Sequence, residues 1–175
     1  MFMKKVVIYK SKTGFTKKYA EWIAEEIGAD IYEEDKTNEE HLLSYDLIVY
    51  GGGIYVSGIS GVKLLTRNYE KIKDKKLIVF ATCLSPIKEN TESEIKSLNF
   101  TEQQQEKINF FLLRGGFDYK RLSFVDKLLM SILRLMLKSK KNPTPDEKGM
   151  LAVYVKSVDW TNKKYIDPIV KMCNE

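Results

Sequence analysis

Three short stretches of this sequence carry residue types that suit a phosphorylated ligand. The first is SKTGFT at residues 11–16, in which Ser11, Thr13 and Thr16 supply hydroxyl donors. Gly14 lets the backbone turn and approach a ligand closely. The backbone N–H groups of this stretch and the positive end of the helix expected after it favour an anion. The stretch therefore predicts a phosphate site, and the alternative is that Ser11 or Thr16 simply caps the helix.

The spacing of the glycines narrows the kind of phosphate ligand. The pattern GxxxxGK[ST] of P-loop nucleotide-binding proteins is absent from the chain. The pattern GxGxxG of dinucleotide-binding domains is absent from the first turn. Both common nucleotide sites are therefore disfavoured.

Two further stretches follow later apolar runs. YGGGIYVSGISG at residues 50–61 combines glycines with Ile54 and Tyr55. A glycine-rich backbone can present N–H and C=O groups to a flat heterocycle while such a side chain covers one face of it. We predict a mobile ligand loop here, and the alternative is a glycine-rich turn with a surface tyrosine. The third stretch consists of Thr82, Cys83, Leu84 and Ser85.

The order of elements places these three stretches together. Short apolar runs rich in β-branched residues predict buried parallel strands; they lie at 5–9, 47–50, 77–81 and 108–113, with a weaker one at 29–32. Helical patterns lie at 16–27, 62–72 and 162–173, and a charged, proline-containing stretch at 138–149 predicts an exposed loop. The alternation predicts an α/β fold with a doubly wound parallel sheet. All three stretches follow strands, so they are expected at the carboxyl edge of the sheet, where such folds bind ligands.

Length and composition fit one domain and exclude several classes of function. The 175 residues are 43% hydrophobic, which is enough for a single core. The net charge of +5 is mild, and no basic stretch is interleaved with aromatic residues, so we expect no nucleic-acid binding. Cys83, Cys173 and the single histidine are far apart in sequence, so we expect no metal site and free thiols in the cytoplasm.

The first stretch resembles a known family. SKTGFT resembles the [ST]-x-T-G-x-T pattern of flavodoxin-like FMN-binding domains over its whole length. The resemblance implies a three-layer α/β fold with strand order 2-1-3-4-5 and FMN as the cofactor. It places the FMN phosphate at residues 11–16 and the flavin ring between the later loops. The implied cofactor-binding residues are Ser11, Lys12, Thr13, Gly14, Phe15, Thr16, Gly52, Gly53, Ile54, Tyr55, Thr82, Cys83, Leu84, Ser85, Gly115 and Gly116.

The second half resembles the menaquinone-dependent protoporphyrinogen oxidases, flavodoxin-like enzymes with a helical insertion near the fifth strand. The shared pattern is an apolar strand, two glycines, a basic stretch, an aspartate and an apolar helix, followed later by Asp159 and Trp160. The resemblance implies one domain over 1–175, with a helical insertion and loop at 118–148.

The same resemblance implies a porphyrin substrate and a quinone acceptor. The candidate substrate or partner residues are Tyr119, Lys120, Arg121 and Arg134. Lys120 and Arg121 would pair with the propionate carboxylates of a porphyrin, or they are solvated surface charges.

The helix expected at 124–138 is apolar except for a narrow stripe formed by Lys127, Ser131, Arg134 and Lys138. It is too short and too charged to span a bilayer. Such a helix could lie at a membrane interface or cover an apolar substrate, which would make the protein peripheral to the inner face of the cell membrane. Alternatively, it packs on its own sheet or in a homodimer.

Two functions follow from these resemblances. The first is an FMN oxidoreductase of the protoporphyrinogen oxidase type, in which the flavin supplies the redox chemistry and no side chain needs to act as a nucleophile. The second is a flavodoxin-type electron carrier that exchanges electrons with a redox protein partner and has no small substrate. A weaker third possibility is an interaction module without FMN. The net charge of +5 favours the first, because carrier flavodoxins resemble one another in being strongly acidic.

Overall fold

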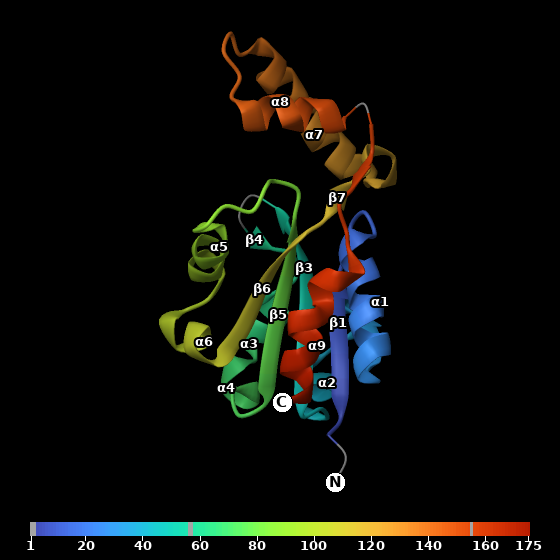
Figure 1. Cartoon of the computed structure of the whole chain (residues 1–175), viewed down its shortest axis with the longest axis vertical. Coiled ribbons are helices and arrows are strands. Elements are labelled where there is room, and N and C mark those ends of the chain that lie inside the picture. The colour runs from blue at the N-terminus through green and yellow to red at the C-terminus, as the bar shows by residue number, and fades with distance from the viewer. Residues whose placement is uncertain (1–2, 56–57, 155) are drawn as a thin grey trace.

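The body of the molecule is a twisted, mainly parallel sheet between two layers of helices (Figure 1). The computed structural model describes residues 3–55, 58–154 and 156–175. The main strands lie in the order β2-β1-β3-β5-β6, with the short β4 paired antiparallel to β3. Their bounds are β1 Lys5–Lys10, β2 Asp30–Glu33, β3 Leu47–Tyr55, β4 Gly58–Ile59, β5 Lys76–Cys83 and β6 Ile108–Arg114. The predicted fold class and strand order are confirmed, because β5 and β6 are the fourth and fifth strands of the parallel sheet.

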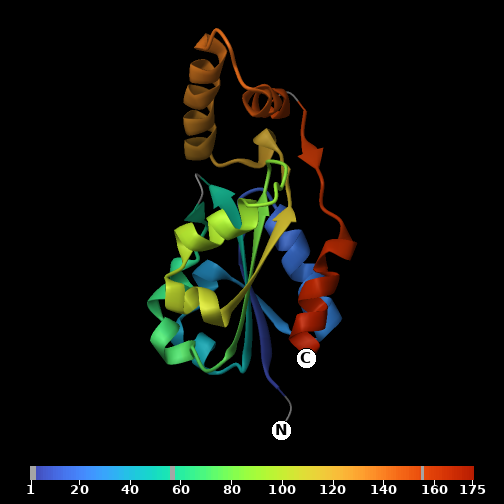
Figure 2. The same cartoon turned by 60° about the vertical axis from the view of Figure 1, so that its left-hand side comes forward.

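Helices cover both faces of the sheet (Figure 2). One face packs on α1 (Phe15–Ile27) and α9 (Asp167–Asn174), and the other packs on the helices from α2 to α6. The latter are α2 Glu39–Leu43, α3 Lys63–Arg67, α4 Tyr69–Ile72, α5 Thr91–Asn99 and α6 Glu102–Lys107, and single 3-10 turns lie at Glu34–Lys36, Tyr119–Arg121 and Lys163–Ile166. The central strands are buried on both faces, as their continuous apolar runs predicted.

The first part of the glycine-rich stretch is a strand and not the predicted mobile loop. β3 continues through Gly51, Gly52 and Gly53 to Tyr55 and turns back into β4. A side chain on Gly51 would lie 2.1 Å from the ring of Phe80, so glycine is needed for β5 to pack here. The strand runs on because its backbone pairs with β1 as far as Gly52 and with β5 as far as Gly53. Residues 56 and 57 of this stretch lie outside the described part of the chain.

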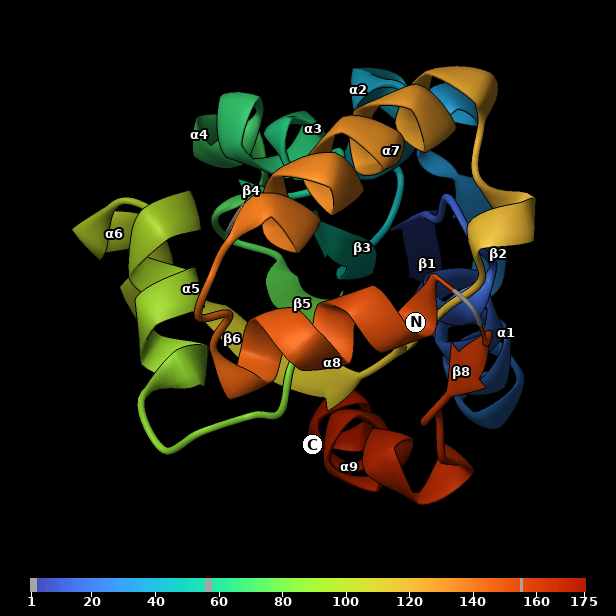
Figure 3. The ribbon, with the colours of Figure 1, turned by 90° about the horizontal axis from the view of Figure 1, so that it is seen from above.

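A helical insertion stands above the carboxyl edge of the sheet. It consists of α7 (Phe124–Ser139) and α8 (Pro145–Val153), and Figures 1 and 2 show the pair beyond the ends of the strands. The chain enters it through β7 (Gly116–Phe117) and leaves it through β8 (Val158–Asp159), which pair antiparallel. We call this two-stranded connection the neck. Seen from above, the two helices lie over the region where the central strands end (Figure 3).

The insertion is longer than the predicted 118–148, and its second helix replaces part of the loop expected at 138–149. The Thr144 hydroxyl accepts a hydrogen bond from the N–H of Glu147, and the Glu147 carboxylate accepts one from the N–H of Thr144. This reciprocal pair starts a helix in spite of the prolines around it, because Pro145 occupies the first helical position, where proline is tolerated.

The bounds of other helices differ from those predicted from the sequence. The pattern at 62–72 forms the two short helices α3 and α4, because Asn68 ends the first one by donating its side-chain amide to the carbonyl of Leu64. The predicted final helix begins as a 3-10 turn before α9. The sequence patterns assigned no helix to the segment that forms α5 and α6.

Candidate functional site

The stretch at residues 11–16 forms a tight turn into α1. Gly14 adopts a left-handed conformation with φ of +94°, and it occupies the N-cap position without any side-chain cap. The Ser11 hydroxyl accepts a hydrogen bond of 3.1 Å from the N–H of Gly14 and so holds the turn. Thr16 lies inside the helix and does not cap it. The helix start is therefore left to interact with an anion.

Hydroxyl groups from the first turn of α1 and the end of β5 meet beside this turn. The Thr16 and Thr82 hydroxyls are 2.7 Å apart and share a hydrogen bond. A Cβ on Gly53 would lie 3.6 Å from the Thr16 oxygen and 3.8 Å from the Thr82 oxygen, and a Cβ on Gly115 would lie 3.2 Å from Cβ of Thr82. The first turn of α1, the ends of β3 and β5, and Gly115 after β6 thus converge on one point at the carboxyl edge.

The insertion contacts this turn through charged side chains. Arg121 donates a hydrogen bond of 3.3 Å to the carbonyl oxygen of Thr13 and also pairs with Asp118. Lys12 donates to the Asp126 carboxylate at the start of α7, and this hydrogen bond holds the pKa of Asp126 below its usual value. The insertion is therefore held by two connections to the body: the neck, and these contacts to the turn at residues 11–16, which we call the phosphate-type turn.

Aromatic and apolar groups lie next to the charged ones. The Lys12 ammonium is 4.5 Å from the centre of the Tyr55 ring, and that ring flanks Gly53. Burial, with the Asp126 charge, raises the pKa of Tyr55 to about 12, so the phenol stays neutral at pH 7. Leu84 packs against the small cluster of Phe117 and Leu122 at the neck.

The thiol of the third stretch is not activated. Burial raises the pKa of Cys83, and its sulfur donates to the carbonyl of Ser85 at 3.4 Å. Cys83 therefore suits a lining role better than that of a nucleophile.

Several predicted cofactor residues also have structural roles. The Phe15 ring packs under the neck, 2.5 Å from where a Cβ on Gly116 would lie, so Gly116 is needed for this contact. A Cβ on Gly52 would lie 2.6 Å from the backbone oxygen of Ser60, so Gly52 serves the β3–β4 hairpin. Ile54 packs against the main core. These residues support the site from behind.

Two predicted substrate residues are engaged within the insertion. The Tyr119 hydroxyl is 3.0 Å from that of Ser131, and the Arg134 guanidinium lies 5.6 Å from the centre of the Tyr154 ring. Lys120 remains exposed, and Arg121 reaches the phosphate-type turn. Tyr119 and Arg134 thus both lie against Tyr154 inside the insertion, whereas Arg121 contacts the turn at residues 11–16.

Sequence reasoning did not assign site roles to Asp126, Arg114 and Trp160. Asp126 carried a readable signal, because Ser123 is the N-cap of α7: its hydroxyl accepts a hydrogen bond from the N–H of Asp126 and donates one to the Asp126 carboxylate. The Arg114 guanidinium lies 4.3 Å from the centre of the Trp160 ring at the end of β6, and its Nε is buried without a hydrogen-bond partner. No local pattern links these two residues, because β6 and the returning strand meet only in the folded molecule.

The Lys12–Asp126 contact gives a testable pH dependence. Because folding lowers the pKa of Asp126, the contact stabilises the fold above the ordinary value of 3.8, and this stabilisation is lost as the pH falls through the lowered value. Asp126→Asn should reduce the free energy of unfolding by less than about 1 kcal/mol at pH 7, because both partners are partly solvated. Urea denaturation over a pH series should show the difference shrinking below pH 3.8.

The control for this prediction is Asp74→Asn, which removes an exposed carboxylate at the opposite end of the sheet. A difference between Asp126→Asn and the parent that stayed constant down to low pH would contradict the assigned contact.

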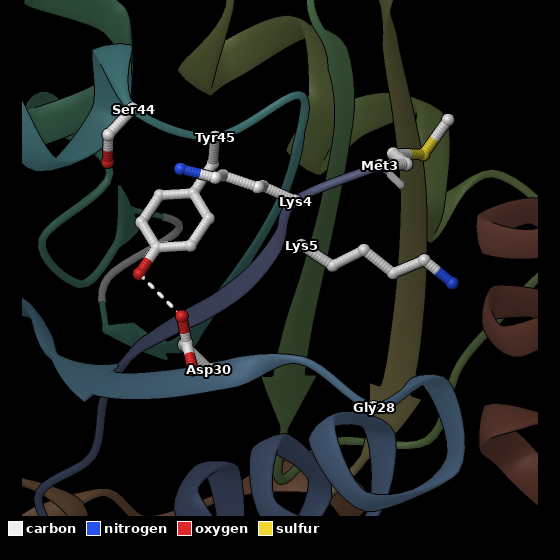
Figure 4. Close-up of a pocket in the computed structure, with 7 residues that line it drawn as sticks. All are labelled: Met3, Lys4, Lys5, Gly28, Asp30, Ser44 and Tyr45. Carbon is white, nitrogen blue, oxygen red and sulfur yellow. Dashed lines mark hydrogen bonds between the residues drawn. The ribbon is translucent and has the colours of Figure 1, made fainter. Parts of the chain in front are cut away.

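A pocket of about 280 Å³ lies at the amino edge of the sheet, far from these groups (Figure 4). Met3, Lys4, Lys5, Gly28, Asp30, Ser44 and Tyr45 line it, and the Tyr45 hydroxyl donates a hydrogen bond of 2.8 Å to Asp30. The pocket faces away from the loops that follow the strands. It therefore contributes nothing to the site at the carboxyl edge.

Fold and site together define a doubly wound α/β protein with an anion-binding turn after its first strand. Residues 6–144 match the family model described as a flavodoxin domain, and the chain belongs to this family. The flavodoxin-like interpretation is confirmed, and FMN is the cofactor that the family implies.

Individual relatives match a smaller part of this chain than the family model does. An uncharacterized protein of Methanocaldococcus jannaschii is 38% identical over 87 residues, which cover 48% of this chain and 57% of that protein. The chain thus spans little more than half the length of this curated relative.

Among solved structures, a WrbA-like flavodoxin from Agrobacterium tumefaciens shares 23% identity, with a TM-score of 0.45 over 62% of this chain and 76% of that one. Reduced flavodoxin from Megasphaera elsdenii shares 18%, with a TM-score of 0.47 over 63% and 85%. A flavoprotein from Lactobacillus acidophilus, solved in complex with FMN, shares 18%, with a TM-score of 0.41 over 65% and 93%.

Proposed function

We propose that this chain is an FMN-dependent oxidoreductase of the protoporphyrinogen oxidase type, which passes electrons from a reduced organic substrate through FMN to a quinone. The observation that carries the proposal is the insertion, which stands over the carboxyl edge and is bonded to the phosphate-type turn through Arg121 and Asp126. A pure electron carrier needs no such cover.

The residues of the turn fit the phosphate of FMN. Ser11, Thr13 and Thr16 bring three hydroxyl groups to the uncapped start of α1, and Gly14 has the left-handed backbone that the turn requires. Arg121 adds a fixed positive charge beside Thr13. Neutral donors, a helix start and a cation together make a suitable environment for a dianionic phosphate.

The residues of the later loops suit a flat, apolar ring. Gly53 and Gly115 keep side chains away from the Thr16–Thr82 hydrogen bond, and Tyr55 offers a neutral aromatic face. FMN would supply the redox chemistry, so the chain has only to orient it, exclude water and admit the substrate. Leu84, which is only partly buried, provides apolar surface on the side of the insertion.

The charges around the neck favour an acidic substrate. Lys120 is exposed there, and Arg121 lies beside it. A porphyrin carries propionate carboxylates that such residues can pair with. The proposal therefore places the acidic edge of the substrate near the neck, between the insertion and the body.

The test begins with the visible spectrum of the purified protein and of the protein after FMN is added. We expect a bound flavin that protoporphyrinogen bleaches under anaerobic conditions and that a menaquinone analogue then reoxidises. A flavin that protoporphyrinogen leaves oxidised, but that a flavodoxin reductase reduces, would instead identify an electron carrier. A protein that stays colourless with added FMN would contradict both functions.

A further inference from the structure

The outward side of α7 is apolar from Phe124 to Met136. Phe124 is 83% exposed and Leu135 is 69% exposed, in a helix where only Leu137 is fully buried. The exposed large apolar residues of this helix are Phe124, Val125, Leu128, Leu129, Ile132, Leu135 and Met136. We call this set the apolar face of α7. A continuous exposed patch of this kind marks an interaction surface.

The polar residues of α7 point the other way or lie along the border of the apolar face. Lys127 donates a hydrogen bond of 3.0 Å to the carbonyl of Lys120, and Ser131 bonds to Tyr119. Arg134 lies over Tyr154 of the same insertion. The polar side chains of the helix thus contact its own insertion, and its apolar side chains face outward. This is the reverse of an ordinary surface helix.

Positive charge is concentrated around the same helix. Residues 119–141 contain seven basic side chains and one acidic side chain, so this segment carries a net charge of +6. Because the whole chain has a net charge of +5, the rest of the molecule carries −1. The one acidic residue, Asp126, is already paired with Lys12. The apolar face therefore lies within a strongly basic segment of the sequence.

We propose that the apolar face of α7 docks in the interface of an anionic phospholipid membrane. Basic residues beside an exposed apolar helix face form the pattern of a helix that lies in the membrane plane. No helix in the described ranges is long and apolar enough to cross a membrane, which leaves the in-plane orientation for α7. Lys138 and Lys141 at the end of the helix would meet the lipid headgroups, whereas Lys140 already pairs with Glu147 of α8.

Charge favours a lipid surface over a second copy of the chain. A symmetric dimer through this face would bring two segments of net charge +6 against each other, and like charges repel at such distances. An anionic bilayer neutralises the same charges. The inference does not depend on FMN or on any substrate, so it can fail while the proposed function stands.

Vesicle flotation with the full chain tests this docking. Vesicles of phosphatidylcholine mixed equally with phosphatidylglycerol should bind the protein at low salt, and pure phosphatidylcholine vesicles should bind it much more weakly. Leu135→Gln should weaken partitioning by about tenfold, since it removes one large apolar side chain from the membrane. The matched control is Leu98→Gln on α5, where the side chain is 67% exposed, and it should bind as the parent does.

A second pair of variants separates charge from apolar contact. Lys138→Gln with Lys141→Gln should reduce both the binding and its salt dependence, whereas Lys107→Gln with Lys164→Gln removes the same charge elsewhere and should not. Equal loss in the two pairs, or equal binding by the two leucine variants, would overturn the proposal. The proposal would also be overturned if the protein did not bind vesicles and instead formed a dimer that Leu135→Gln dissociates. A second copy of the chain would then cover the apolar face of α7.

Discussion

Replacing Thr16 by valine should weaken FMN binding by about 10- to 100-fold. The change keeps the shape of a buried side chain but removes the hydroxyl that bonds to Thr82 beside the anion-binding turn. A hydrogen bond to a charged group is worth about 1.5–3 kcal/mol, which corresponds to this range. Fluorescence titration of the apoprotein with FMN measures the effect, because bound and free flavin differ in emission.

The control is Thr101→Val, which removes a threonine hydroxyl that lies outside the candidate site. Thr101 caps α6 in a reciprocal pair with Gln104, well away from the carboxyl edge, so its loss should cost about 1 kcal/mol of stability. FMN affinity should remain that of the parent in this variant. If both variants lost affinity equally, the effect would reflect general destabilisation, and Thr16 would not belong to the phosphate site.

Gly51→Ala should destabilise the protein by about 3 kcal/mol, although it adds a single methyl group. The new Cβ would lie 2.1 Å from the ring of Phe80, which is fully buried and cannot move aside. For a chain of this length, the melting temperature should fall by about 6–12 °C. Thermal denaturation followed by circular dichroism gives the shift. The double variant with Phe80→Leu should recover part of the loss.

Gly149→Ala is the matched control for this prediction. Gly149 lies in α8 with nothing within 4 Å of the position that a Cβ would occupy. Alanine has the higher helix propensity, so this variant should be as stable as the parent or more stable by up to about 1 kcal/mol. Comparable losses in the two variants would show that Gly51 is not the tight contact described.

The sheet could be predicted from the sequence because its signal is local. Continuous apolar runs such as those that became β1 and β5 identify strands buried on both faces, and alternation with helices fixes the fold class. The end of β3 could not be predicted in the same way. Gly51 and Gly52 look like a loop in sequence, but they pair with β1 and β5 in the sheet, and the approach of Phe80 and Ser60 explains why both residues are glycine.

The candidate site could likewise be predicted from the sequence only where the signal is local. The turn from Ser11 to Gly14 follows from residue types and from its place after a strand. The Thr16–Thr82 pair could be expected only as neighbours at one edge, because their hydrogen bond depends on how far each strand extends. The Lys12–Asp126 contact joins residues more than a hundred positions apart, and nothing local predicts it.

The neck has a consequence for how such a chain can change. Gly116 pairs with Asp159 and Phe117 with Val158, so the chain leaves the body and returns at neighbouring points. To the body, everything from 118 to 157 behaves as one long turn, and the entropy of closing a turn grows only slowly with its length. The insertion can therefore be lengthened, shortened or replaced during evolution at little cost to the sheet. The fold separates the part that holds the anion-binding turn from a part that selection can exchange to suit a new partner.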